Sequence, residues 1–110
     1  MFYSYYQNNT GGSFVGPQCV IIEAEAAEDA NILSSKAGVY FDGVLNGIDC
    51  SCCGDRWYRT YDYIGDNVPS FYNEPISEAT SGFPWTKPTG IIYYLDGTKE
   101  PFDINEEGLT

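Results

Sequence analysis

The sequence contains no histidine and only five lysine and arginine residues among 110. Without histidine, the chain lacks the side chain that most often acts as a general base near neutral pH. A nucleophilic cysteine or serine would have no imidazole to activate it, and neither a paired-carboxylate nor a phosphate-loop motif is present. We therefore expect a protein that is not an enzyme and that uses no cofactor.

Positively charged residues are few, and acidic residues outnumber them. Sixteen aspartate and glutamate residues stand against the five cationic ones, so the formal net charge is −11. This charge repels duplex nucleic acid and anionic membranes, and we expect neither as a partner. An anionic ligand must therefore be small and held by a local group of cations.

Long apolar runs are also missing. No stretch approaches the roughly 20 apolar residues that span a bilayer, and the N-terminus lacks the cationic start of a signal peptide. We expect a cytoplasmic protein. Because 110 residues suit one core and 43% of them are hydrophobic, we expect a single domain over residues 1–110.

The first half of the sequence predicts a strand-helix-strand scaffold. Phe2–Tyr6 has aromatic strand character. Residues 18–24 form a short β-branched run typical of a buried strand, and residues 26–37 repeat apolar positions at the three- and four-residue spacing of a helix. A glycine follows as the expected helix stop. Residues 39–44 are predicted to be the next strand, so that residues 18–44 form one compact unit.

The second half predicts loops and a hairpin. Residues 60–90 contain four prolines, which favour long loops with short extended pieces. In residues 91–104, an Asp-Gly pair separates two apolar runs, the pattern of a β-hairpin. We therefore predict an α+β fold, in which a small antiparallel or mixed β-sheet with one principal α-helix combines the strand-helix-strand unit and this C-terminal hairpin.

Residues 48–59 concentrate the scarce reactive groups of the chain, because they hold three of the four cysteines and both arginines. Cys50 and Cys53 have the C-x-x-C spacing of one zinc knuckle. No second knuckle exists, so a closed site would need Cys19 or Cys52 or nearby carboxylates such as Asp49. We assign no metal site, and a structural zinc staple remains an alternative.

The end of this segment suits ligand binding. Residues 54–59 combine a tight turn with two guanidinium groups and aromatic faces, which together fit a phosphate and a planar base. In an extended segment Arg56 and Arg59 would point to opposite faces unless the turn bends the chain. The alternative is that Asp55 and Arg56 form an ion pair or cap the turn, while Trp57 packs in the core. The candidate ligand-binding residues here are Asp55, Arg56, Trp57 and Arg59.

A second polar loop near the N-terminus provides amides, hydroxyls and backbone N–H groups, which hold a polar small molecule without much charge. A plain hairpin turn is the alternative explanation of its two glycines. The candidate ligand-binding residues of this loop are Asn8, Asn9, Thr10, Gly12 and Ser13.

Four segments in order, residues 8–14, 23–31, 38–43 and 49–57, resemble a family of small, uncharacterised tailed-bacteriophage proteins. The resemblance rests on an NN-T/S-GG-x-F loop and a DCxCCGDRW motif, and it covers residues 8–59. It transfers no catalytic or binding residue to this chain. It implies an accessory protein that acts in the cytoplasm of an infected bacterial host.

Two hypotheses follow. The leading one is a non-enzymatic protein that sequesters a small nucleotide-type ligand and so counters host defence. We expect a homo-oligomer in this case, because so short a chain most easily builds a closed site between subunits. The alternative is an interaction protein that docks on a host protein and inhibits it, with the cysteine motif as a structural or zinc-binding staple.

Overall fold

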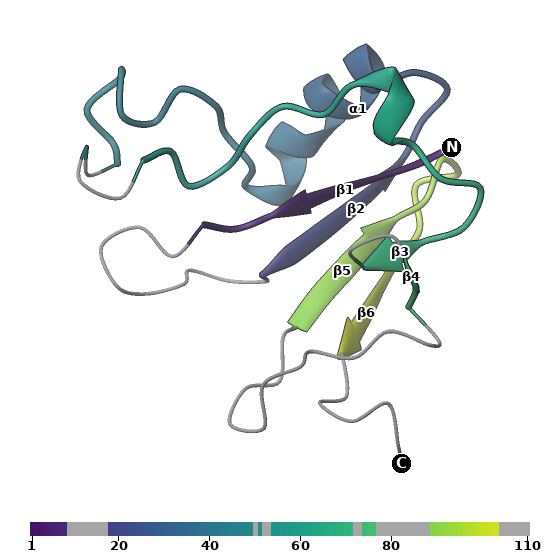
Figure 1. Cartoon of the computed structure of the whole chain (residues 1–110). Coiled ribbons are helices and arrows are strands. Elements are labelled where there is room, and N and C mark those ends of the chain that lie inside the picture. Colours follow the sequence, from purple (N-terminus) through teal and green to yellow (C-terminus); the bar gives the residue numbers. More distant parts are fainter. Residues whose placement is uncertain (9–17, 50, 52–53, 72–73, 77–88, 104–110) are drawn as a thin grey trace.

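A four-stranded sheet forms the centre of the computed structural model, which describes residues 1–8, 18–49, 51, 54–71, 74–76 and 89–103 (Figure 1). Its strands are β1 (Phe2–Tyr6), β2 (Cys19–Glu23), β5 (Thr89–Tyr93) and β6 (Lys99–Asp103). In the order β1-β2-β5-β6, the outer pairs are antiparallel and the central β2–β5 pair is parallel. The described residues contain one α-helix, α1 (Ala27–Ser34). The predicted α+β fold, a small mixed sheet with one principal helix, is therefore confirmed.

β2 is the most deeply buried strand because it lies between β1 and β5. Its β-branched residues Val20 and Ile21 are fully buried, as expected for a central strand that is covered on both faces. Burial alternates in β1 instead, where Tyr3 and Tyr5 are buried and their neighbours are half-exposed. The strand period of two therefore places one face of β1 in the core.

The helical segment ends where the sequence predicts. α1 continues into the 3-10 turn η2 (Ser35–Ala37), and Gly38 then takes the left-handed conformation with a φ of 87°. This geometry favours glycine, which has no Cβ to clash. The predicted helix over residues 26–37 is confirmed. In the part of the chain that the structure describes, no helix is long and apolar enough to cross a membrane.

The N-terminus of α1 is capped by a distant residue. No side chain of the preceding turn accepts a hydrogen bond from the helix. Instead, the Ala27 backbone N–H donates to Oδ1 of Asp62, at 2.8 Å, from the 3-10 turn η3 (Asp62–Ile64). A carboxylate in this place satisfies an unpaired N–H group and lies at the positive end of the helix dipole.

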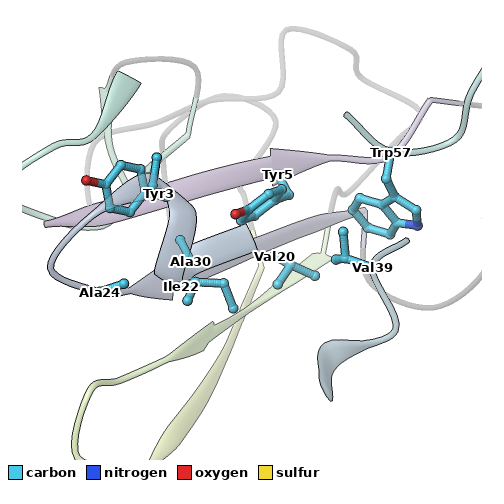
Figure 2. Packing of buried hydrophobic residues seen from close by; sticks show 9 residues of the cluster. Tyr3, Tyr5, Val20, Ile22, Ala24, Ala30, Val39 and Trp57 are labelled. Atoms are coloured by element: carbon cyan, nitrogen blue, oxygen red, sulfur yellow. The ribbon is translucent and has the colours of Figure 1, made fainter. Parts of the chain in front are cut away.

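Two apolar clusters hold the helix and the sheet together. The cluster on the helix side consists of Tyr3, Tyr5, Val20, Ile22, Ala24, Ala27, Ala30, Val39 and Trp57 (Figure 2). The other consists of Cys19, Ile21 and Ile92, with Phe2, Tyr6, Ile76, Tyr94 and Phe102 packed against it. Because residues of β2 alternate between the two clusters, these lie on opposite faces of the sheet.

The predicted strand over residues 39–44 is wrong. The predicted strand-helix-strand unit of residues 18–44 is therefore also wrong in its second strand. Both edges of β2 are taken, by β1 and by β5, so the parallel partner that follows the helix is β5. Val39 is buried in the core, but the chain then turns, with Asp42 at a φ of 59° and Gly47 at 74°. The positive φ values interrupt the extended backbone that a strand needs.

The predicted C-terminal hairpin is confirmed as β5 and β6. Its turn is closed by the Tyr94 N–H, which donates to the Thr98 carbonyl at 2.8 Å, and Gly97 has a φ of 93°. Thr98 also donates its backbone N–H to Asp96 Oδ1. Between residues 60 and 90, the described part holds η3 and the short strands β3 (Ser70–Phe71) and β4 (Glu74–Pro75), in agreement with the expected loops and short extended pieces.

Candidate functional site

Trp57, one of the predicted ligand-binding residues, lies in the core. Its side chain is 4% exposed and belongs to the helix-side cluster, beside Val39 (Figure 2). A ring packed in this way has no face left for a ligand. The prediction that Trp57 stacks on a planar base is therefore wrong, and the alternative that it packs in the core is confirmed.

Arg56 is bound within the fold. Its Nη1 donates to Gln7 Oε1 at 2.5 Å, and its Nε lies 3.9 Å from Oδ1 of Asp49. The Arg56 side chain is 12% exposed and that of Asp49 is 2% exposed. The sequence suggested Asp55 as the partner of Arg56, but the structure places Asp49 there, because Asp55 Oδ1 accepts the Val44 N–H at 2.9 Å.

Asp49 is the centre of this network. Its Oδ1 accepts the Tyr40 hydroxyl at 2.6 Å, and its Oδ2 accepts the Arg56 backbone N–H at 2.8 Å. Burial and the bond to Asp49 both raise the pKa of Tyr40. The carboxylate also fills the space over Gly43, where a Cβ would lie 1.8 Å from Asp49 Oδ2. A glycine is therefore required at position 43 for this close approach.

The structure brings Asn8, the described residue of the predicted N-terminal loop, to the arginine segment. The Asn8 N–H donates to the Arg56 carbonyl at 2.7 Å, and the Asn8 side-chain amide donates to the Asp55 carbonyl at 3.1 Å. The other predicted loop residues, Asn9, Thr10, Gly12 and Ser13, lie outside the described residues. Asn8, Asp55 and Arg56 therefore form one connected group, which joins the end of β1 to the segment after the cysteines.

Arg59 belongs to a separate contact. Its Nη1 and Nη2 donate to the two carboxylate oxygens of Asp42, at 3.1 and 2.7 Å, and its guanidinium lies 4.9 Å from the centre of the Phe41 ring. The hydrogen bonds from Arg59 lower the pKa of Asp42. Both side chains are exposed to solvent. Arg56 and Arg59 therefore do not form a joint clamp on one phosphate.

The described residues offer no metal site. Cys19 is fully buried in one cluster with Ile21 and Ile92, and burial raises the pKa of its thiol. A protonated thiol in an apolar cluster is a packing group and does not ligate zinc. No three carboxylates or cysteines of the described ranges come together. The zinc alternative therefore depends on Cys50, Cys52 and Cys53, which lie outside those ranges.

Sequence reasoning missed a groove between α1 and the β5–β6 hairpin. α1 lies over β1 and β2 (Figure 1), and no second α-helix of the described residues covers the hairpin. The groove has a volume of about 450 Å³. It is lined by Ile22, Glu23, Leu33, Lys36, Tyr93, Tyr94, Leu95, Gly97, Thr98 and Lys99.

Both apolar and cationic side chains line this groove. Leu33 and Tyr93, which are partly exposed, supply aliphatic and aromatic surface. Lys36 and Lys99, two of the chain's five cationic residues, come from η2 and β6. Neither lysine forms an ion pair with another described residue.

The same groove contains one acidic residue, Glu23. Glu23 Oε1 accepts the Leu95 backbone N–H at 2.9 Å, which ties the hairpin turn to the end of β2. The groove presents two ammonium groups and this one carboxylate, together with apolar side chains. Lys36 and Lys99 are far apart in the sequence and line one groove only in the folded chain. The one hint of this site in the sequence is that any cationic residue is unusual in so acidic a chain.

Comparison with curated proteins gives no match, and comparison with solved structures gives none either. One protein family, described as "Domain of unknown function (DUF7296)", matches residues 1–110. The match spans the strands, the helix, the cysteine segment and both lysines of the groove. The chain therefore belongs to the DUF7296 family.

Proposed function

We propose that this protein is a non-enzymatic binder of a small nucleotide-type anion, and that the ligand occupies the groove between α1 and the β5–β6 hairpin. The observation that carries the proposal is the presence of Lys36 and Lys99 in one apolar, aromatic groove of a chain whose net charge is −11. The long-range field of such a chain repels anions, so capture depends on a local group of cations.

The size and the surface of the groove support this class of ligand. Sites for small molecules range from about 300 to 1,000 Å³ and are mostly apolar with a few polar groups, and this groove has about 450 Å³. The Tyr93 ring and the Leu33 side chain suit a planar base. Lys36 and Lys99 suit a phosphate, because an ammonium group attracts it as a point charge.

The proposal moves the ligand away from the arginine turn. Arg56 is held by Gln7 and Asp49, and Trp57 is buried. Displacing Arg56 toward a ligand would leave the Asp49 carboxylate buried without its cationic partner, which is costly. Neither lysine of the groove forms an ion pair with any residue that the structure describes.

The biological side of the proposal is sequestration of a nucleotide signal during phage infection, and it is supported by the resemblance to small tailed-phage proteins. A binder that acts by sequestration needs tight, water-excluding contact. In one chain the groove remains partly open to solvent, and a second subunit over this opening would close it. We therefore propose a homo-oligomer as the binding form.

Isothermal titration calorimetry with a panel of cyclic and linear nucleotides, at about 50 mM salt, tests the proposal. We expect at least one nucleotide to bind, and a Lys36→Ala/Lys99→Ala double variant to bind it at least about tenfold more weakly. Arg59→Gln is the matched control, because it removes a cation outside this groove, and it should retain the parent affinity. No heat with any nucleotide would contradict the proposal.

A further inference from the structure

The outer side of α1 carries an exposed apolar residue where a solvated helix face is expected. Ile32 is 65% exposed, and it lines two shallow grooves that meet at its side chain. One groove, of about 270 Å³, also contains Leu33 and Leu95. The other, of about 490 Å³, also contains Tyr61. Because they share Ile32, the two grooves form one continuous surface.

We call this the α1 surface and define it by Glu25, Glu28, Asp29, Ile32, Tyr61 and Leu95. Its apolar members are all largely exposed, Leu95 at 59% and Tyr61 at 54%. Tyr61 also stacks on Tyr63, with ring centroids 5.9 Å apart and planes 4° from parallel. Single exposed apolar residues are common on protein surfaces, whereas a contiguous set that is rimmed by polar groups marks an interaction site.

The rim of the α1 surface is acidic. Glu25, Glu28 and Asp29 are exposed, and their carboxylates form no hydrogen bond or ion pair with any described residue. Glu28 and Asp29 also favour the helix through its dipole, but Glu25 precedes α1 and has no such role. The one cation in these grooves is Arg59, which Asp42 already binds with both oxygens.

We propose that the α1 surface binds a cationic amphipathic helix of a partner protein. The apolar side chains of such a helix would fill the grooves on either side of Ile32, and its lysine or arginine residues would reach Glu25, Glu28 and Asp29. Anionic membranes and nucleic acids carry the same sign of charge as this surface and are repelled. Two copies joined through it would bring the same carboxylates together.

This surface is distinct from the proposed ligand groove. Lys36 and Lys99 line only the groove between α1 and the hairpin, whereas Ile32, Glu25 and Asp29 line none of it. The inference therefore does not depend on nucleotide binding. It gives the protein a second activity, contact with a basic protein partner, on a surface whose smaller groove adjoins the ligand groove at Leu33 and Leu95.

Fluorescence anisotropy with a labelled synthetic peptide tests the inference. The probe is a helical peptide of leucine and lysine with the leucines on one face, and the comparison peptide has glutamate in place of each lysine. We expect the lysine peptide to bind at least about tenfold more tightly, with an affinity that falls between about 50 and 200 mM salt. Equal binding of the two peptides would overturn the inference.

Variants separate a specific site from general attraction to an acidic protein. Ile32→Ser and the Glu25→Gln/Asp29→Asn double variant should each weaken binding at least about fivefold. The matched control is Asp96→Asn/Glu100→Gln, which removes the same number of charges on the hairpin and keeps acceptors for Thr98 and Tyr94. It should remain within about twofold of the parent.

Two results would refute this site. An equal loss in the Asp96→Asn/Glu100→Gln control, or no loss in Ile32→Ser, would show that binding is non-specific. Sedimentation of the protein without peptide is measured in parallel. If the protein self-associates and Ile32→Ser abolishes this self-association, the surface binds a second copy of the chain instead. Since Ile32, Glu25 and Asp29 are exposed, all these variants should fold, which circular dichroism checks.

Discussion

Replacing Asp62 with alanine should destabilise the protein, although Asp62 is itself exposed. Its Oδ1 accepts the Ala27 N–H at 2.8 Å and caps the N-terminus of α1. The residue directly before α1 provides no side-chain cap. Loss of a helix cap costs about 0.5–2 kcal/mol, and loss of a carboxylate at the positive end of the helix dipole costs about 0.3–1 kcal/mol.

Neighbouring carboxylates reduce this cost. Asp62 and Asp29 lie close enough to Tyr3 that both raise its pKa, after burial as the largest cause. Removing one of two nearby like charges relieves a repulsion of a few tenths of a kcal/mol. We therefore expect Asp62→Ala to lower the free energy of unfolding by about 1–1.5 kcal/mol. For a domain of this size this corresponds to roughly 4–10 °C in the melting temperature.

Urea denaturation followed by circular dichroism measures this change, with two comparison variants. Asp62→Asn keeps an oxygen that accepts the Ala27 N–H and should lose less than about half as much. Glu100→Gln removes an equal charge from the hairpin and should change the free energy by no more than about 0.5 kcal/mol. The reasoning is refuted if Asp62→Ala matches the parent, or if Asp62→Asn is as unstable as the alanine variant.

Two further predictions concern the interior. In Gly43→Ala the new Cβ would lie 1.8 Å from Asp49 Oδ2, so the network breaks at a cost of about 1–3 kcal/mol in urea denaturation. A Cβ at Gly47 would have nothing within 4 Å, so Gly47→Ala should lower the free energy of unfolding by only about 1 kcal/mol, because of the positive φ. Equal losses in Gly43→Ala and Gly47→Ala would contradict the role of Asp49. Burial raises the pKa of Tyr5 and Cys19 above their usual 10.0 and 9.0, so the unfolded chain releases these protons first. Stability should therefore fall as pH rises above about 9, and a melting temperature that is constant from pH 8 to 11 would refute this.

The elements that the sequence predicts are those with a local cause. The period of two in Phe2–Tyr6, the helical spacing before Gly38 and the Asp-Gly pair of the hairpin each act within a few residues. All three are found in the structure. They depend little on what the rest of the chain does, which is why one sequence is enough to locate them.

The predictions that failed depend on partners far along the chain. Residues 39–44 have strand composition, but β5 competes successfully for the edge of β2. Trp57 has the same neighbours in sequence whether it faces a ligand or the core, and only packing against Val39 and the sheet decides between them. The Lys36–Lys99 groove likewise depends on how α1 and the hairpin lie in the fold, which no local pattern of the sequence specifies.

The parallel pairing of β2 with β5 also dictates the order in which the chain can fold. Cys19 pairs with Gly90 and Ile22 with Tyr93, so the middle of the sheet joins segments that are synthesised far apart in time. Contacts of such long sequence separation form slowly, because a large loop must close first. Until residues 89–103 emerge from the ribosome, β2 has a bare hydrophobic edge, and a chaperone that shields this edge should raise the yield of folded protein.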